Sequence, residues 1–197
     1  NRKSASVSFR DALISGQPDD KGLYFPAEIP LFPAELISNL SSLSNADIAF
    51  QVIRPYVGGE IPDDALHRIC RETVDFEFPL IRISDYISVL ELFHGPTLAF
   101  KDVGARFMSR CLRYFSRESE EKIVVIVATS GDTGGAVASA FHNVEGVSVV
   151  IMYPKGKVSR VQELQLTTFG GNVITLEVQG TFDDCQRLAK QALADDQ

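Results

Sequence analysis

Three short, largely apolar runs in the second half of the chain constrain its fold more than any other feature. They are Ile123–Ala128, Val147–Tyr153 and Val173–Val178. Runs of this length, rich in β-branched residues, are typical of strands that are covered on both faces. Helical patterns lie between them over Gly135–His142 and Ser159–Phe169, and a last one runs from Phe182 to Ala194. This alternation predicts a parallel sheet with right-handed crossovers, and therefore an α/β fold.

The first part of the chain has a different sequence pattern, which is helical and interrupted by prolines. Ala46–Tyr56 places apolar residues on one helical face, and Pro62 opens a second helix. Two further candidate strands, Leu80–Ser84 and Val89–Phe93, follow Pro79. We therefore expect a helical N-terminal region over residues 1–79 and an α/β domain over residues 80–197.

A glycine-rich turn, Thr129–Gly135, directly follows the first buried run. A strand, a glycine-rich turn and a helix in this order point free backbone N–H groups at an anion. Ligands of parallel sheets bind beyond the carboxyl ends of the strands, so this turn and the Lys155–Ser159 loop are expected at one edge. The alternative is that the turn only caps a helix, through Asp132 or Thr133.

The segment His94–Asp102 places a lysine, Lys101, where a turn meets a helix over Val103–Phe115. The helix N-terminus and the neighbouring apolar side chains Phe93, Leu98 and Phe100 both disfavour a charged amine. A neutral lysine amine adds to carbonyl groups as a Schiff base. The alternative is an ordinary solvated lysine at a helix start.

Composition excludes several classes of function. The net charge of −7 argues against a nucleic-acid partner, and no apolar stretch approaches the ~18 residues of a membrane span. Three widely spaced cysteines lack a metal-binding spacing, so we expect reduced thiols and no metal. No signal peptide is visible, and we expect a cytoplasmic protein; the alternative is a protein whose transit peptide has been removed.

The segments Leu92–Asp102 and Thr129–Gly134 together resemble the threonine synthases, a family of pyridoxal-phosphate (PLP) enzymes in the tryptophan-synthase-β-like group, fold type II. Further matches lie at Asp20–Pro26, at Tyr153–Ser159 with Gln162 and Glu163, and at Gly180–Gln186. Asp132 stands where relatives that act on serine or cysteine usually carry asparagine. The resemblance spans nearly the whole chain and implies a threonine-synthase-like N-terminal region followed by part of a PLP-binding domain.

The resemblance also implies the roles of individual residues. Lys101 would bind PLP covalently and then move protons at the substrate carbons, and Asp132 and His94 would contact the cofactor. The substrate-binding residues would be Thr129, Ser130, Gly131, Thr133, Lys155 and Ser159. The alternative for His94 is that it only shapes the turn, and the alternative for the loop lysines is that they are simply solvated. Asp102 is as compatible with stabilising the helix start as with a chemical role.

The implied reaction converts O-phosphohomoserine and water to threonine and phosphate. In the family, the PLP phosphate loop and the partner of the pyridine nitrogen lie beyond the position that matches Gln197. We therefore expect a fragment that does not catalyse by itself. The other functions considered are another fold type II PLP lyase, a synthase-like paralogue and a catalytically silent domain.

Overall fold

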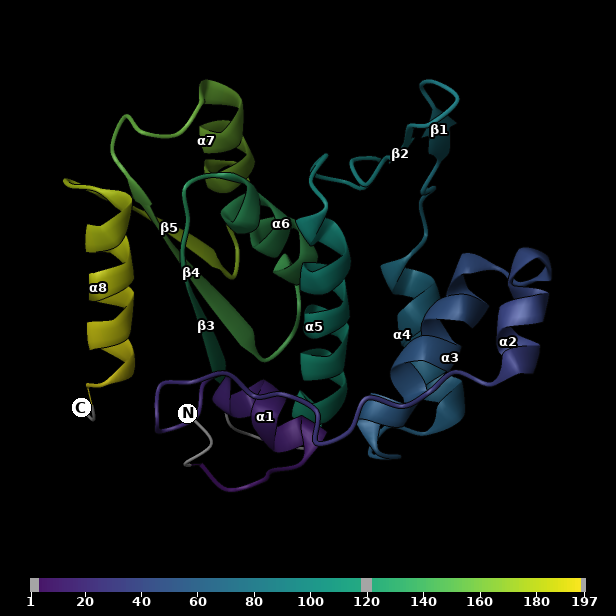
Figure 1. The fold of residues 1–197 in the computed structure, drawn as a ribbon. Helices are drawn as coiled ribbons and strands as arrows, with labels where there is room; N and C mark the ends of the chain where they lie inside the picture. Colours follow the sequence, from purple (N-terminus) through teal and green to yellow (C-terminus); the bar gives the residue numbers. More distant parts are fainter. Residues whose placement is uncertain (1–3, 118–121, 196–197) are drawn as a thin grey trace. The chain divides into compact units, whose positions relative to one another are not determined.

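A computed structural model describes residues 4–117 and 122–195 (Figure 1). The chain forms two compact units, Asn1–Asp75 and Phe76–Gln197. The first unit is helical in its described part, and the second is α/β. Among the described residues, no helix is both long and apolar enough to cross a membrane.

The first unit is built around two packed helices, α3 (Asn45–Val57) and α4 (Asp63–Thr73), which confirms both helices predicted here. A reciprocal capping box between Ser44 and Asp47 starts α3, and Pro62 precedes α4. Smaller elements complete the unit: α1 (Phe9–Ser15), α2 (Ala34–Asn39) and the 3₁₀ turn Leu40–Ser42. Glu60 holds the start of α1 by accepting hydrogen bonds from the Phe9 and Arg10 amides.

The second unit contains the predicted parallel sheet. Its strands are β3 (Ile123–Ala128), β4 (Val147–Pro154) and β5 (Val173–Val178), in the order β3-β4-β5. Ala128 pairs with Met152, and Tyr153 pairs with Glu177. The carboxyl ends of the strands therefore meet at one edge, where the loops that follow β3 and β4 begin.

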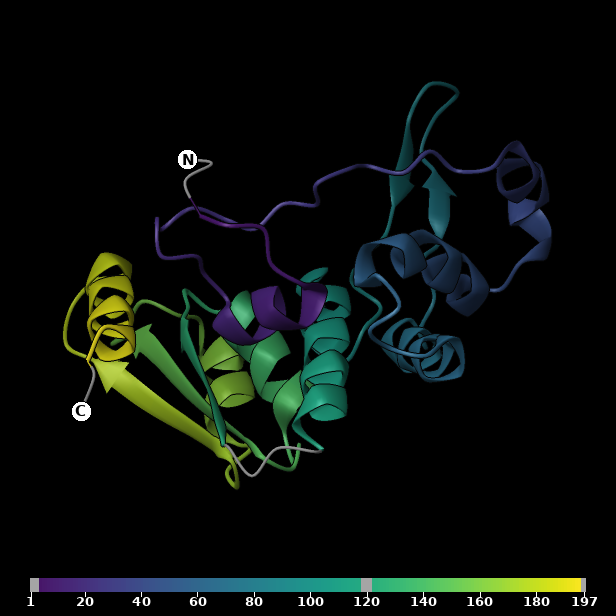
Figure 2. The same cartoon turned by 90° about the horizontal axis from the view of Figure 1, so that it is seen from below.

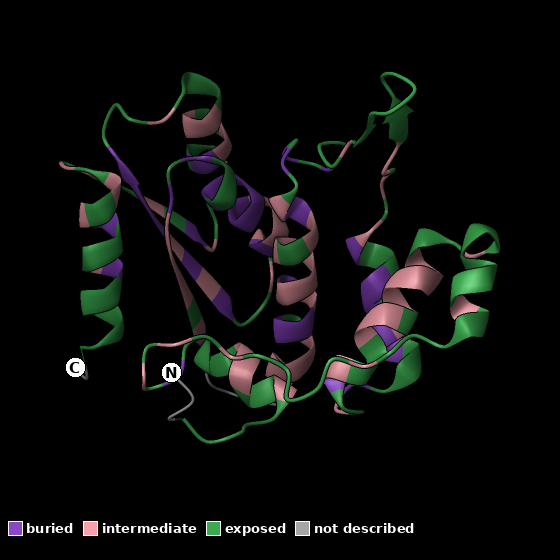
Figure 3. Cartoon of the chain, viewed as in Figure 1, coloured by how far each residue is buried: buried purple, intermediate pink, exposed green. Residues whose placement is uncertain are grey.

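Helices cover the sheet on both sides, as Figure 2 shows. On one side, α8 (Phe182–Leu193) packs through Cys185 and Ala189 against Met152. On the other side lie α5 (Lys101–Ser116), α6 (Asp132–Phe141) and α7 (Arg160–Thr167). Burial is concentrated in β4 and in α6 (Figure 3). The α/β expectation is confirmed.

The two predicted strands that follow Pro79 lie outside the parallel sheet. They are shorter than predicted, β1 (Leu80–Arg82) and β2 (Ser88–Leu90), and pair with each other as an antiparallel hairpin. Every residue of both strands is exposed.

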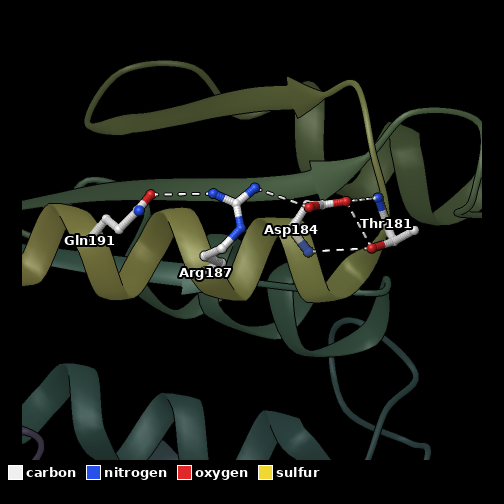
Figure 4. A network of polar contacts seen from close by, with 4 residues as sticks. All are labelled: Thr181, Asp184, Arg187 and Gln191. Carbon is white, nitrogen blue, oxygen red and sulfur yellow. Dashed lines mark hydrogen bonds and ion pairs between the residues drawn. The ribbon is translucent and has the colours of Figure 1, made fainter.

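Helix α8 begins with a chain of polar contacts (Figure 4). The Thr181 hydroxyl accepts from the Asp184 amide, and the Asp184 carboxylate accepts from the Thr181 amide and from Arg187. The hydrogen bond from the Thr181 amide, followed by the one from Arg187, lowers the pKa of Asp184 to about 2. The acidic pair at Asp183 and Asp184 thus serves the helix start, as electrostatics predicts.

Candidate active site

A buried carboxylate orders the loop that carries Lys101. Asp102, 1% exposed, accepts hydrogen bonds from the Thr97 amide at 2.9 Å and from the Thr97 hydroxyl at 2.6 Å. Gly95 lies against this pair, because a Cβ there would stand 2.5 Å from Asp102 Oδ2. Leu98 completes the tight turn with a φ of 59°. Asp102 therefore folds the loop back onto the first turn of α5.

Lys101 is the first residue of α5, two residues earlier than the predicted helix start. Its side chain is half-buried, and Nζ lies 4.1 Å from the centroid of the Phe100 ring. The predicted apolar enclosure is incomplete, since Leu98 and Phe100 are 71% and 60% exposed. Within the described residues, Lys101 has no ion-pair partner, so its amine remains available to a ligand.

His94 contacts its own loop. Its Nε2 lies 2.7 Å from Glu91 Oε2, and its ring stacks on Phe93. These contacts hold the backbone that leads into Gly95. A contact between His94 and a cofactor stays a prediction.

The buried side chain of Thr129, which is 1% exposed, holds the backbone of the Thr129–Gly134 turn in place. Its hydroxyl oxygen accepts from the Gly131 amide at 3.0 Å and from the Gly134 amide at 2.8 Å. Among the described residues, the amides of Ser130, Asp132 and Thr133 have no hydrogen-bond acceptor. The turn thus presents several unpaired N–H groups at the start of α6, the arrangement that suits an anion.

Gln162 of α7 joins this turn to the loop that follows β4. Its Nε2 donates to Asp132 Oδ1 at 2.7 Å, and its Oε1 accepts from the Ser159 amide at 3.0 Å. The two loops therefore lie side by side, as predicted. Gln162 was not predicted as a site residue. The Ser159-x-x-Gln162 spacing, a capping-box pattern, is the sequence signal that points to it.

Two of the positive charges in and beside the loop after β4 are neutralised by glutamates. Lys155 pairs with Glu177 at 3.3 Å, and Arg160 pairs with Glu163 at 3.0 Å. Ser159 caps α7 by accepting from the Gln162 amide. Of the cations in this loop, Lys157 is exposed and forms no ion pair within the part of the chain described.

Tyr153 is a further polar residue at this edge that sequence reasoning missed. It lies near the end of β4 and is 5% exposed. Burial raises the pKa of its hydroxyl, and the charges of Glu177 and Glu163 raise it further. Its phenol therefore stays protonated at neutral pH and can serve as a hydrogen-bond donor.

Two hollows in the described part of the surface lie elsewhere. Each has a volume of about 320 Å³, and neither includes a predicted site residue. One is in the first unit, and the other lies at the opposite edge of the sheet, where β4 begins. Within the described residues, the candidate site is a set of adjoining loops at the carboxyl edge.

Two family models match the chain. The model described as "Threonine synthase N terminus" matches residues 1–74, and the model "Pyridoxal-phosphate dependent enzyme" matches residues 77–197. Among curated proteins, the threonine synthase of Buchnera aphidicola (subsp. Baizongia pistaciae) is 42% identical over the whole chain, which covers 46% of that protein. The chain thus spans less than half the length of the curated relatives it matches.

Solved structures give the same picture. The PLP-bound threonine synthase of Brucella melitensis is 41% identical, with a TM-score of 0.89 over 98% of this chain and 43% of its own. The threonine synthase of Escherichia coli is 40% identical, with a TM-score of 0.88 over 96% of this chain and 44% of its own. These similarities extend over both units.

Proposed function

Because the chain belongs to the family of pyridoxal-phosphate-dependent enzymes, we propose that its parent protein is a threonine synthase, which converts O-phosphohomoserine and water to threonine and phosphate. One observation carries the proposal: the Lys101 loop and the Thr129–Gly134 turn lie on neighbouring elements and both contact α7. An amine and an anion-binding turn held by one helix suit an amino-acid substrate that binds beside an aldehyde cofactor.

The residues present fit the amine-linked part of pyridoxal phosphate. Lys101 offers a half-buried amine without an ion-pair partner in the described chain, and Asp102 and Thr97 hold its loop in one conformation. Pyridoxal phosphate, when bound, supplies an electron sink that stabilises negative charge at the substrate carbons. Lys101 Nζ would hold the cofactor, with Asp132 and His94 as further contacts.

Lys101 would also carry protons. Once its amine is free, Nζ can take a proton from one substrate carbon and return it to another. The buried Asp102–Thr97 pair keeps the start of α5 fixed during this transfer, since a misplaced base loses much of its effectiveness. Asp102 is thus proposed to position the base without touching the substrate.

The turn after β3 would bind the substrate carboxylate. The unpaired amides of Ser130, Asp132 and Thr133 and the Thr133 hydroxyl supply hydrogen-bond donors at the positive end of α6. Thr129 and Gly131 would act by shaping the turn, because the Thr129 hydroxyl already accepts two backbone bonds.

The loop after β4 would face the departing phosphate. Lys157 is the cation without an ion pair in this part of the chain, and Ser159 stands at the start of α7. Lys155 would contribute after exchanging Glu177 for the ligand, since their pair is exposed and such pairs are weak. Cationic and hydroxyl donors form strong, charge-assisted hydrogen bonds to a dianionic phosphate, so these side chains would stabilise it as it leaves.

Cys70, Cys111 and Cys185 are buried and form no disulfide, which supports a reducing, cytoplasmic location, and we include that location in the proposal. The proposed partner is the small-molecule substrate.

The experiment is a comparison of Lys101→Ala with Lys157→Ala in the full-length parent protein. The wild type should release threonine and phosphate from O-phosphohomoserine and yield a borohydride-reduced cofactor adduct at Lys101, read by mass spectrometry. Lys101→Ala should lose both signals. Lys157→Ala should keep the adduct, because only Lys101 is needed to hold the cofactor. It should raise the KM for O-phosphohomoserine, because Lys157 is assigned to the phosphate of the substrate.

Two results would contradict the proposal. A reduced adduct at another lysine of the wild type would remove Lys101 from its role. An adduct at Lys101 without threonine formation would point to another reaction of the same family.

A further inference from the structure

The side chain of Gln162 occupies the centre of the candidate site although no part of the proposed reaction uses it. It projects from the first turn of α7 and is half-buried. One end of its amide bonds to Asp132, 30 positions away, and the other bonds to the Ser159 backbone, so one group connects the two loops.

The orientation of this amide is dictated by its partners. The Ser159 N–H can only donate, and an ionised Asp132 carboxylate can only accept. Oε1 must therefore face Ser159, and Nε2 must face Asp132. A flipped amide would place a donor against a donor and an acceptor against an acceptor.

Gly131 gives Gln162 the room it needs. A Cβ at Gly131 would lie 2.4 Å from Gln162 Cδ and Nε2 and 2.7 Å from Oε1. Gly131 also has a φ of 141°, a conformation that favours glycine. The backbone of the turn is thus shaped to receive the Gln162 amide.

Gln165 extends the same helix face to the Lys101 loop. Its Nε2 donates to the Thr97 carbonyl at 3.3 Å, and Thr97 bonds in turn to Asp102. One face of α7 therefore contacts the turn after β3 and the loop before α5.

We propose that Gln162 is a positioning residue that aims the Asp132 carboxylate and couples the Thr129–Gly134 turn to the Ser159 loop, a role that rests on the proposed function. Without Gln162, Asp132 would rotate freely beside the donors assigned to the substrate carboxylate. The Ser159 loop would also lose its fixed distance from the turn.

The first experiment is Gln162→Glu in the full-length protein. Glutamate keeps the acceptor for the Ser159 amide but sets a second carboxylate against Asp132, so the pair holds a proton to a higher pH than a lone carboxylate. The neighbouring charges are largely paired, Lys155 with Glu177 and Arg160 with Glu163. Lys101 and Lys157 are the other cations on the adjoining segments, and neither pairs with Asp132.

At pH 8 we expect kcat/KM of Gln162→Glu to fall between about tenfold and a hundredfold, and to recover toward pH 6 as the pair takes up a proton. The second experiment adds Asp132→Asn to Gln162→Glu. The new asparagine amide can donate to the new glutamate carboxylate, which restores the contact with its polarity reversed. The double variant should therefore regain activity at pH 8 and lose the new pH dependence.

The control is Asp132→Asn alone. It keeps the contact with Gln162 and reports the cost of the lost charge.

Amide hydrogen exchange supplies a readout that needs no turnover. Gln162→Met keeps the side-chain volume but frees the Ser159 amide, whose exchange should accelerate. Gln165→Met, the matched control on the same face, should leave the Ser159 amide protected.

The failures of the two proposals are distinguishable. If the wild type forms no threonine, the proposed function fails while exchange at Ser159 still tests the contact. If the wild type is active but the effects of Gln162→Glu and Asp132→Asn simply add, with an unchanged pH profile, Gln162 has no positioning role. Unchanged exchange at Ser159 in Gln162→Met would equally overturn it.

Discussion

Asp102 shows how one buried side chain can fix a reactive neighbour. A carboxylate that is 1% exposed must be satisfied by hydrogen bonds, and Thr97 supplies two of them. This pairing closes the turn before α5 and leaves Lys101 at the first position of the helix. The loop is therefore ordered from its buried side.

We expect Asp102→Leu to destabilise the second unit by about 1–3 kcal/mol, because the Thr97 amide would remain buried without an acceptor. Asp102→Asn should cost less, since its oxygen can accept from the Thr97 amide while its nitrogen donates to the hydroxyl. Urea unfolding monitored by circular dichroism measures both. Equal losses in the two variants would show that Asp102 acts through its charge and not through these bonds.

The site was only partly predictable at this scale. Lys101 and the Thr129–Gly134 turn stand out because local sequence marks them: a glycine-rich turn after a strand and a lysine at a helix start. For Gln162, the Ser159-x-x-Gln162 spacing signals a helix cap but not the contact with Asp132, which lies 30 positions away. No local pattern marks Gln165, whose contact with Thr97 spans 68 positions. Contacts of that kind depend on how the elements pack.

At the scale of elements, two helical glycines differ in what surrounds them. Gly134 of α6 is buried, and a Cβ there would lie 2.5 Å from Thr129 Cγ2 and 2.7 Å from Leu166 Cδ2. Gly104 of α5 is exposed and has no heavy atom within 4 Å of such a Cβ. Only Gly134 is required by packing, where it lets α6 approach α7 and Thr129 closely.

We expect Gly104→Ala to stabilise the chain by roughly 0.5–1 kcal/mol, because alanine is the better helix former. Gly134→Ala has the same intrinsic preference, yet it should destabilise by about 1–3 kcal/mol through overpacking. Urea unfolding of both variants against the wild type measures the difference. A stabilised Gly134→Ala would mean that α6 can move away from Leu166 at little cost.

The sequence located most elements of the second unit but not all their ends. β3 and β5 match their predicted runs, and β4 extends one residue further, to Pro154. Helix α7 ends at Thr167, two residues before the predicted end at Phe169. Helices α1 and α2 were missed because segments of seven and six residues are too short to display a clear apolar period.

For the whole molecule, alternating strands and helices were enough to predict the α/β class, because apolar, β-branched runs of this length are typical of parallel strands buried on both faces. They were not enough to place the hairpin. The segment around β1 and β2 carries apolar residues like those of a buried strand, including Ile81, Ile83, Ile87 and Val89, and these side chains are 42% to 64% exposed. Only the packing distinguishes such a segment from a core strand.

This exposed hairpin should dominate the solution behaviour of the 197-residue chain. Tyr86 at its tip is 98% exposed, and Leu80 and Leu90 on its paired strands are 67% and 54% exposed. Exposed apolar side chains on a hairpin with open strand edges promote self-association. We expect the chain to bind a hydrophobic fluorescent dye and to sediment with a mass that rises with concentration.

The variant Ile83→Ser/Tyr86→Ser should reduce both the dye fluorescence and the association. It should leave the circular dichroism spectrum unchanged, because neither side chain is buried. Leu193→Ser is the matched control, since Leu193 is 66% exposed but lies at the end of α8, away from the hairpin sequence. If Leu193→Ser lowers the association as much as the hairpin variant does, the surface responsible lies elsewhere in the chain.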